Sequence, residues 1–217
     1  MPDRKITWFL GILMVGCLIV GVETTPVKNY ILLVNALSVG FVISAAFYFL
    51  VVYLPESQKR SRIYRSMEKQ YQFFKKSCIS TFLILSNSQD YPHSEMLLDQ
   101  EEFRRYFEHK NTNNRKRWDA VINGIQDNEY YLNEILYELR VLNDEIKFVR
   151  SAIDIHDEEV FLYLNTLSRI ILRMEATKPE YDDIKSLSRF LWEIFTGRSF
   201  IDDRKTDIIA DMIGRIK

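Results

Sequence analysis

Few side chains in this sequence could carry out chemistry. The chain has three histidines (His93, His109 and His156) and two cysteines (Cys17 and Cys78), and they do not fall at spacings that bind a metal ion. Its seven glycines are scattered, so the sequence offers no glycine-rich loop to hold a phosphate group. We therefore expect no metal, no cofactor and no catalytic residue. Both cysteines are interpreted as small apolar fillers.

One pair of residues, Arg104 and His109, has a spacing that could act on a phosphate group. The two lie in a stretch that is predicted to be helical. The R-x4-H pattern resembles the loose signature of HEPN-type ribonucleases, and this resemblance implies that the two side chains act together on a scissile phosphate. Arg105 departs from the polar residue that usually follows the arginine in that family. A solvated helix end explains the same residues. The chain is therefore expected not to be an enzyme, and a membrane-tethered ribonuclease is an alternative.

Other charged clusters have simpler explanations. Arg115, Lys116 and Arg117 precede a predicted helix, and such a cluster is typical of a solvated helix start. The sequence therefore does not favour direct contact with nucleic acid. The acidic pairs Asp182–Asp183 and Asp202–Asp203 lie at or near predicted helix starts, where they complement the helix dipole.

Hydropathy divides the chain into two parts. Residues 1–54 contain two apolar runs, 6–22 and 30–54, without internal charges, whereas residues 55–217 are charge-rich and amphipathic. A helix rises about 1.5 Å per residue, so the first run reaches roughly 25 Å, near the lower limit for crossing a bilayer. The second run spans a bilayer easily. Because no cleavage site follows the first run, we interpret both as membrane spans rather than as a signal peptide and a span. The sequence thus predicts a two-pass transmembrane hairpin.

Flanking positive charges predict the orientation of this hairpin. Arg4 and Lys5 precede the first span, only Lys28 lies in the loop, and a basic cluster follows the second span. Because loops rich in lysine and arginine stay in the cytoplasm, both termini are expected there, with residues 23–29 outside. The expected location is the bacterial inner membrane.

A basic stalk is predicted directly after the second span, over residues 55–86. Residues 55–76 carry a net charge of +5, whereas residues 77–217 carry −7. Pro55 is expected to end or kink the span because it lacks a backbone N–H. Four stalk residues are expected to contact anionic lipid headgroups: Lys59, Arg60, Arg62 and Arg65.

The second span carries small and polar residues on one helical stripe. Asn35, Ser38 and Ala45 follow helical spacing. An amide that faced lipid would lose its hydrogen bonds, so this stripe is expected to lie in a helix interface. The interface could join subunits, pack the hairpin or line a polar path. We favour the first, a homo-oligomer.

Residues 87–217 are predicted to form an all-α cytoplasmic domain. Expected helices cover residues 100–109, 115–153, 154–176, 179–197 and 203–217, after a stalk helix over 56–85. The longest has apolar residues spaced alternately three and four apart, with Asn128 as its polar member and Leu132 and Leu139 among the apolar ones. This heptad pattern predicts either a coiled coil between subunits or the central helix of a bundle within one chain.

The organisation of the chain resembles the membrane subunit of Kiwa-type bacterial anti-phage defence systems. The resemblance rests on the hairpin, on the helical remainder and on the junction Tyr53-Leu54-Pro55-Glu56-Ser57-Gln58-Lys59-Arg60. It implies a membrane oligomer that senses phage attack and holds a soluble partner that binds nucleic acid. No functional residue carries over.

Together these observations lead us to expect a non-enzymatic scaffold or sensor. It would contact membrane lipids, form a homo-oligomer and recruit a soluble cytoplasmic partner. A pore-forming effector that depolarises the membrane is a further alternative.

Overall fold

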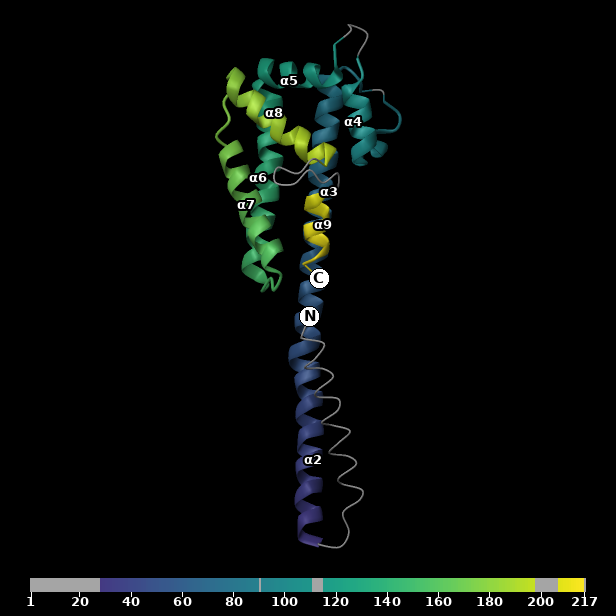
Figure 1. The fold of residues 1–217 in the computed structure, drawn as a ribbon, viewed down its shortest axis with the longest axis vertical. Coiled ribbons are helices and arrows are strands. Elements are labelled where there is room, and N and C mark those ends of the chain that lie inside the picture. The colour runs from purple at the N-terminus through teal and green to yellow at the C-terminus, as the bar shows by residue number, and fades with distance from the viewer. Residues whose placement is uncertain (1–27, 90, 111–114, 198–206, 217) are drawn as a thin grey trace. The chain divides into compact units, whose positions relative to one another are not determined.

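The computed structural model describes residues 28–89, 91–110, 115–197 and 207–216 (Figure 1). Within these residues the chain is helical, and the pairing of extended backbone is limited to one isolated bridge, between Lys110 and Lys116. The all-α fold class predicted from the sequence is confirmed for this part of the chain. The structure divides into two compact units, an N-terminal unit up to Arg62 and a helical domain over Ile63–Ile216.

The described part of the N-terminal unit is an apolar helix. It comprises α2 (Lys28–Tyr48), η1 (Phe49–Tyr53) and the start of α3 (Leu54–Leu85). The first predicted span, residues 6–22, lies outside the described residues, as does most of the predicted loop. The two-pass hairpin and its orientation therefore stay predictions.

Pro55 does not end the helix, contrary to one of the two outcomes that the sequence suggested. It lies within the first turn of α3, and the irregularity is one turn earlier, where η1 is a π-helix. Proline has no N–H, and its ring crowds the carbonyl four residues before it, which here belongs to Val51. The wider turn of a π-helix accommodates both effects.

The helical domain packs its remaining helices around the C-terminal part of α3 (Figure 1). Helices α6 and α7 form an antiparallel pair, α8 packs on α4 and α5, and α9 contacts α7. The elements after α3 are η2 (Ser94–Leu98), α4 (Gln100–Glu108), α5 (Arg117–Asp127), α6 (Glu129–Ala152), α7 (Glu158–Met174), α8 (Tyr181–Thr196) and α9 (Ile208–Gly214).

The structure sets the division of the chain at a different place from the predicted stalk. Residues 55–86 are not a separate element, because α3 from Ile63 onwards belongs to the helical domain. One face of α3 supplies nine buried side chains: Ile63, Met67, Tyr71, Phe74, Lys75, Cys78, Ile79, Phe82 and Leu83. The helix that continues from the apolar segment is therefore a core helix of the domain.

An aromatic cluster fills the centre of the domain. Phe82 of α3 is fully buried, and its ring meets those of Trp118 and Phe195 at centroid distances of 5.3 Å each. It also meets Phe103 and Phe107 of α4, each edge-on at 6.2 Å. Edge-to-face aromatic pairs contribute about 0.5–1.5 kcal/mol beyond their burial, so this cluster joins α3, α4, α5 and α8.

The single long helix predicted over residues 115–153 is wrong. The chain breaks at Asn128, whose backbone is extended (φ −137°, ψ 102°), and forms α5 and α6 on either side. The Asn128 side chain accepts a hydrogen bond from the N–H of Tyr130 at 3.0 Å, so it caps α6. Asparagine competes with helical backbone bonds in this way, and the heptad spacing gave no sign of it.

The apolar seam of α6 faces the inside of the same chain. Leu132 and Leu139 are fully buried, together with Ile135, Leu142 and Ile146. In this fold these side chains are used within the domain and are not available to a second copy. Of the two arrangements predicted from the heptads, the structure supports the bundle within one chain. Asn128, the expected polar seam residue, is exposed at the helix start.

We expect the substitution Asn128→Ala to lower the free energy of unfolding by about 1 kcal/mol, the usual loss for a helix cap. Its oligomeric state should not change, because the capping side chain is exposed and bonds only to its own helix. Urea unfolding and size-exclusion chromatography in detergent test both statements. The conservative variant Asn128→Asp, which keeps a cap acceptor, should retain the stability.

Local hydrogen bonds set the other helix boundaries. The predicted cap of α7 was Asp154, but Asp157 takes this role, accepting from the N–H groups of Glu159 and Val160 at 3.1 and 3.3 Å. Helix α8 ends at Gly197, whose φ of +69° lies in the left-handed region that favours glycine.

Candidate membrane anchor and candidate sites in the helical domain

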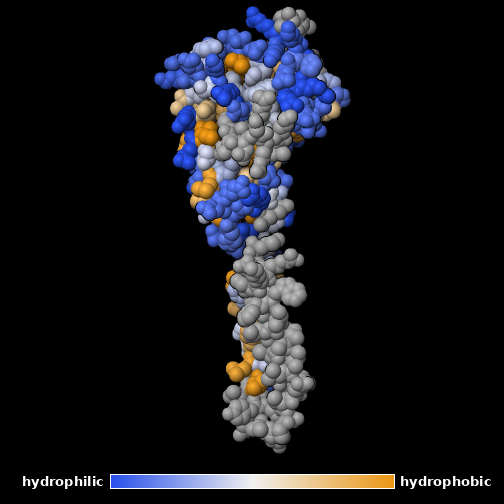
Figure 2. Space-filling view, in the orientation of Figure 1, coloured by the Kyte–Doolittle hydropathy of each residue, from blue (hydrophilic) through white to orange (hydrophobic). Residues whose placement is uncertain are grey.

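The apolar helix of the N-terminal unit is the first candidate site. One helix among the described residues, Val34–Leu85, is long and apolar enough to cross a membrane. Its apolar window is not buried, and Leu37, Ile43 and Phe47 are 63–67% exposed (Figure 2). Because exposed apolar area costs about 25 cal/mol per Å² in water, an apolar surrounding stabilises this segment. The helix is thus compatible with insertion into a membrane.

The predicted oligomerisation stripe lies on α2. Asn35 is exposed, whereas Ser38 and Ala45 are half-buried. The structure places them on one helix, and their contact with a second subunit stays a prediction.

The four predicted lipid-binding residues lie in the first part of α3. Lys59, Arg62 and Arg65 are exposed, and Arg60 is half-buried. Their contact with headgroups stays a prediction. Next to them along α3, the apolar side chains of Ile63 and Met67 turn into the core of the helical domain.

A buried cation, Lys75, lies in the core of the helical domain. Its residue is 3% exposed, its Nζ donates to the backbone oxygen of Leu98 at 2.9 Å, and it pairs with Asp207 Oδ2 at 3.2 Å. The Tyr71 hydroxyl donates to Asp207 Oδ1 at 2.9 Å. Burial, followed by the charge of Asp207, raises the pKa of Tyr71 well above its usual value, so its hydroxyl stays a neutral donor. These bonds tie α3 to η2 and to the start of α9.

Sequence reasoning missed this network, although part of it left a signal. Lys75 interrupts the apolar face formed by Tyr71, Phe74 and Cys78, and a lysine at such a position needs a buried partner. Its partner is 132 residues away in the sequence. Helical periodicity carries no information about that pairing.

The single described cysteine, Cys78, is a structural residue. It is 1% exposed, and burial raises the pKa of its thiol well above the usual value. A protonated buried thiol is a poor nucleophile. This confirms the interpretation of Cys78 as an apolar filler, whereas Cys17 lies outside the described residues.

A second buried polar network joins α6 and α7. Asn143 is fully buried and accepts a hydrogen bond from the hydroxyl of Ser168 at 2.7 Å. Its amide donates to Glu175 at 3.4 Å, and Arg140 lies 3.7 Å from the same carboxylate. Buried polar groups that satisfy one another in this way fix how two helices pack.

The structure brings Arg104 and His109 into one surface depression of about 620 Å³. Nδ1 of His109 contacts the backbone oxygen of Arg105, and Arg105 pairs with Glu102. The depression is lined by both signs of charge: Glu101, Glu102, Arg104, Arg105, Glu108, His109 and Lys110. The R-x4-H residues are therefore neighbours, but carboxylates surround them.

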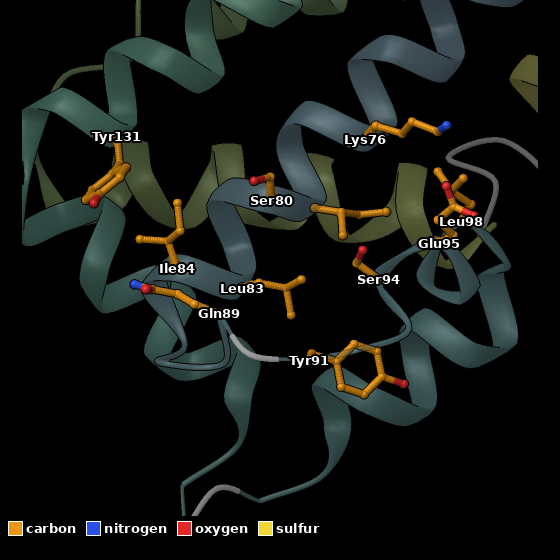
Figure 3. Close-up of a pocket in the computed structure, with 11 residues that line it drawn as sticks. Lys76, Ser80, Leu83, Ile84, Gln89, Tyr91, Ser94, Glu95, Leu98 and Tyr131 are labelled. Carbon is orange, nitrogen blue, oxygen red and sulfur yellow. The ribbon is translucent and has the colours of Figure 1, made fainter.

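A second cleft, of about 610 Å³, opens between α3, η2 and the start of α6. Figure 3 shows Ser80 and Leu83 on α3 and Ser94 and Tyr91 on the following segment around it. Aliphatic side chains alternate with hydroxyls, and the charges of Lys76 and Glu95 oppose each other. This lining does not define one class of ligand. In the residues that the structure describes, no group of three or more metal-binding side chains comes together.

Comparison with known proteins found no family model, no curated protein and no solved structure that matches this chain.

Proposed function

We propose that this protein is a non-enzymatic membrane scaffold or sensor that forms a homo-oligomer and recruits a soluble cytoplasmic partner. The observation that carries the proposal is the dual use of one helix. Helix α3 begins at Leu54, at the end of the apolar segment, and supplies nine buried side chains to the helical domain. A rotation or tilt of this helix would therefore act directly on the domain's packing.

The position of the π-helix supports a mechanical role. It lies at Phe49–Tyr53, directly before Pro55, where backbone hydrogen bonding is weakest. A disturbance of the membrane would change the geometry of this turn at low cost. The basic residues that follow, Lys59 to Arg65, would hold the next turns at the headgroups.

The polar chemistry of the domain supports a scaffold rather than an enzyme. Its buried polar side chains bond to one another and join helices, as Lys75 does with Asp207 and Asn143 with Ser168. The proposed recruiting surface is the acidic exterior of the later helices, to which exposed Glu134, Asp144 and Asp182 belong. A soluble partner with a basic face would fit this surface.

If the stripe of α2 joins subunits, the substitution Asn35→Leu should change the oligomer size of the full chain in mild detergent. An amide in an apolar interface contributes about 0.6–2 kcal/mol through hydrogen bonds across helices, enough to shift a weak assembly. Light scattering after size-exclusion chromatography gives the mass of the protein. The control is Ile43→Leu, an exposed apolar position on the same helix. An Asn35→Leu variant with wild-type mass would contradict the proposed interface.

The pore-forming alternative makes the opposite prediction for membrane potential. A scaffold leaves the potential of overexpressing cells intact, so a potential-sensitive dye should report no difference from cells that express a chain lacking residues 1–54. Depolarisation specific to the full chain would replace the scaffold proposal with the pore.

A further inference from the structure

The structure joins two basic clusters that are separate in the sequence. An antiparallel bridge pairs Lys110 with Lys116, and the N–H of Arg117 donates to the backbone oxygen of His109 at 3.1 Å. The end of α4 therefore lies beside the start of α5. We call the described residues 104–110 and 115–117 the basic surface.

The basic surface stands out from an acidic domain. It holds one acidic residue, Glu108, and six basic ones: Arg104, Arg105, Lys110, Arg115, Lys116 and Arg117. Because residues 77–217 sum to −7, those outside the 104–117 stretch sum to −12. Glu101 and Glu102 border the surface and reduce its charge, but Glu102 is already paired with Arg105. Figure 2 shows hydrophilic side chains gathered over this end of the domain.

Aromatic rings are interleaved with these cations. The Arg117 guanidinium lies 4.4 Å from the ring centroid of Tyr106 and donates to the backbone oxygen of the same residue at 3.1 Å. The Tyr106 ring meets Tyr91 at 4.5 Å, and Tyr91 meets exposed His93 at 6.4 Å. The guanidinium is thus held in place, and a row of rings leads away from it.

This combination selects among anionic ligands. Guanidinium groups bind phosphate oxygens through paired N–H donors, and aromatic side chains stack on unpaired bases. Acidic proteins and lipid headgroups offer negative charge without planar bases. Single-stranded nucleic acid offers both.

The place of the basic surface in the domain does not favour lipid. Phe107 and Trp118, which underlie it, contact Phe82 near the end of α3. The chain enters the domain at Ile63, which is about 28 Å away along α3 at 1.5 Å per residue. The surface therefore lies at the end of the domain remote from the chain's entry.

We propose that the basic surface binds single-stranded nucleic acid, with phosphates on its arginine and lysine side chains and bases against the Tyr91–His93 end of the aromatic row. This goes beyond the scaffold function and does not depend on it. It also revises the expectation from sequence, where the two basic clusters were considered apart.

The test uses the full chain in detergent and fluorescein-labelled 20-nucleotide poly(U) and poly(dT), with binding followed by fluorescence anisotropy. The variant Arg104→Glu/Lys116→Glu should weaken binding at least tenfold. Because each lost phosphate contact removes about 0.7 from the slope of log K against log salt, that slope should fall by about 1.4. The control Lys178→Glu/Lys185→Glu changes the net charge equally at exposed positions elsewhere and should alter affinity less than twofold.

The aromatic contribution is tested separately. Tyr91→Leu should weaken binding about fivefold or more and leave the salt slope unchanged, because stacking releases no counterions. Tyr91→Phe keeps the ring and should bind as the wild type does.

Four results would overturn the proposal. They are absence of binding to either oligonucleotide at 50 mM salt, wild-type affinity in the Arg104→Glu/Lys116→Glu variant, equal losses in this variant and the control, and equally tight binding of a 20-residue poly-glutamate. The second would assign binding to the stalk, and the last would make this a surface for an acidic protein.

Discussion

Replacing Phe82 by alanine should lower the free energy of unfolding of the helical domain by about 3–5 kcal/mol, the usual range for a buried phenylalanine. Phe82 is fully buried and touches four aromatic rings from three other helices. Its loss leaves a cavity at the point where α3, α4, α5 and α8 meet. Because a small domain has only about 5–15 kcal/mol of stability, the variant should be close to unfolding at 37 °C.

The same helix provides the control for this prediction. Phe73 of α3 is 62% exposed, so Phe73→Ala should change the stability by less than about 0.5 kcal/mol. Urea unfolding of the full chain in detergent, followed by circular dichroism and by fluorescence of Trp118 and Trp192 in a Trp8→Phe background, measures both. Equal stability of the two variants would show that Phe82 is not at the centre of the core.

Replacing Lys75 by methionine should lower the free energy of unfolding by about 3 kcal/mol, at the lower end of the range for breaking a buried ion pair. The substitution leaves the carboxylate of Asp207 and the backbone oxygen of Leu98 without their donor. The side chain of Asp207 is 22% exposed, so water offsets part of the loss. Helix α9 should loosen first, because Asp207 is its cap.

A double-mutant cycle separates the pair from its surroundings. Asp207→Asn keeps an acceptor for Tyr71 and for the cap of α9 but leaves Lys75 charged and unpaired. The double variant Lys75→Met/Asp207→Asn should be more stable than the sum of the single losses predicts, by about 1 kcal/mol or more. Additive losses would mean that the two charges do not interact.

Features that depend on periodicity could be predicted from the sequence. The apolar run over residues 30–54 is helical in the structure, and the seam of α6 is buried where the heptad spacing places apolar residues. Both follow from short-range repetition of residue types. The same spacing could not tell a contact within the chain from one between chains, because Leu132 and Leu139 suit either.

The failures come from interactions that periodicity does not record. Asn128 interrupts the helix through a local side-chain hydrogen bond, at a position that the heptad pattern treats as part of the seam. Pairs far apart in the sequence were equally out of reach. Lys75 meets Asp207, and Arg215 meets Asp157, only after the helices pack.

The candidate sites divide in the same way. The basic residues of α3 could be recognised because they follow the apolar run directly. The basic surface could not, because its two clusters meet through the bridge between Lys110 and Lys116. Between these two residues the sequence holds only the neutral stretch 111–114 and Arg115, a pattern that gives no sign of a turn bringing the clusters together.

The central claim, a helical domain held in the cytoplasm by a membrane hairpin, is tested most directly by cysteine accessibility. In a Cys17→Ala/Cys78→Ala background, single cysteines are introduced as Asp3→Cys, Thr25→Cys and Ser151→Cys, and intact spheroplasts are treated with a membrane-impermeant maleimide. The account predicts labelling of Thr25→Cys in intact spheroplasts and labelling of the other two only after lysis. Labelling of Ser151→Cys before lysis would contradict it, and labelling of Asp3→Cys before lysis would leave one span where the account requires two.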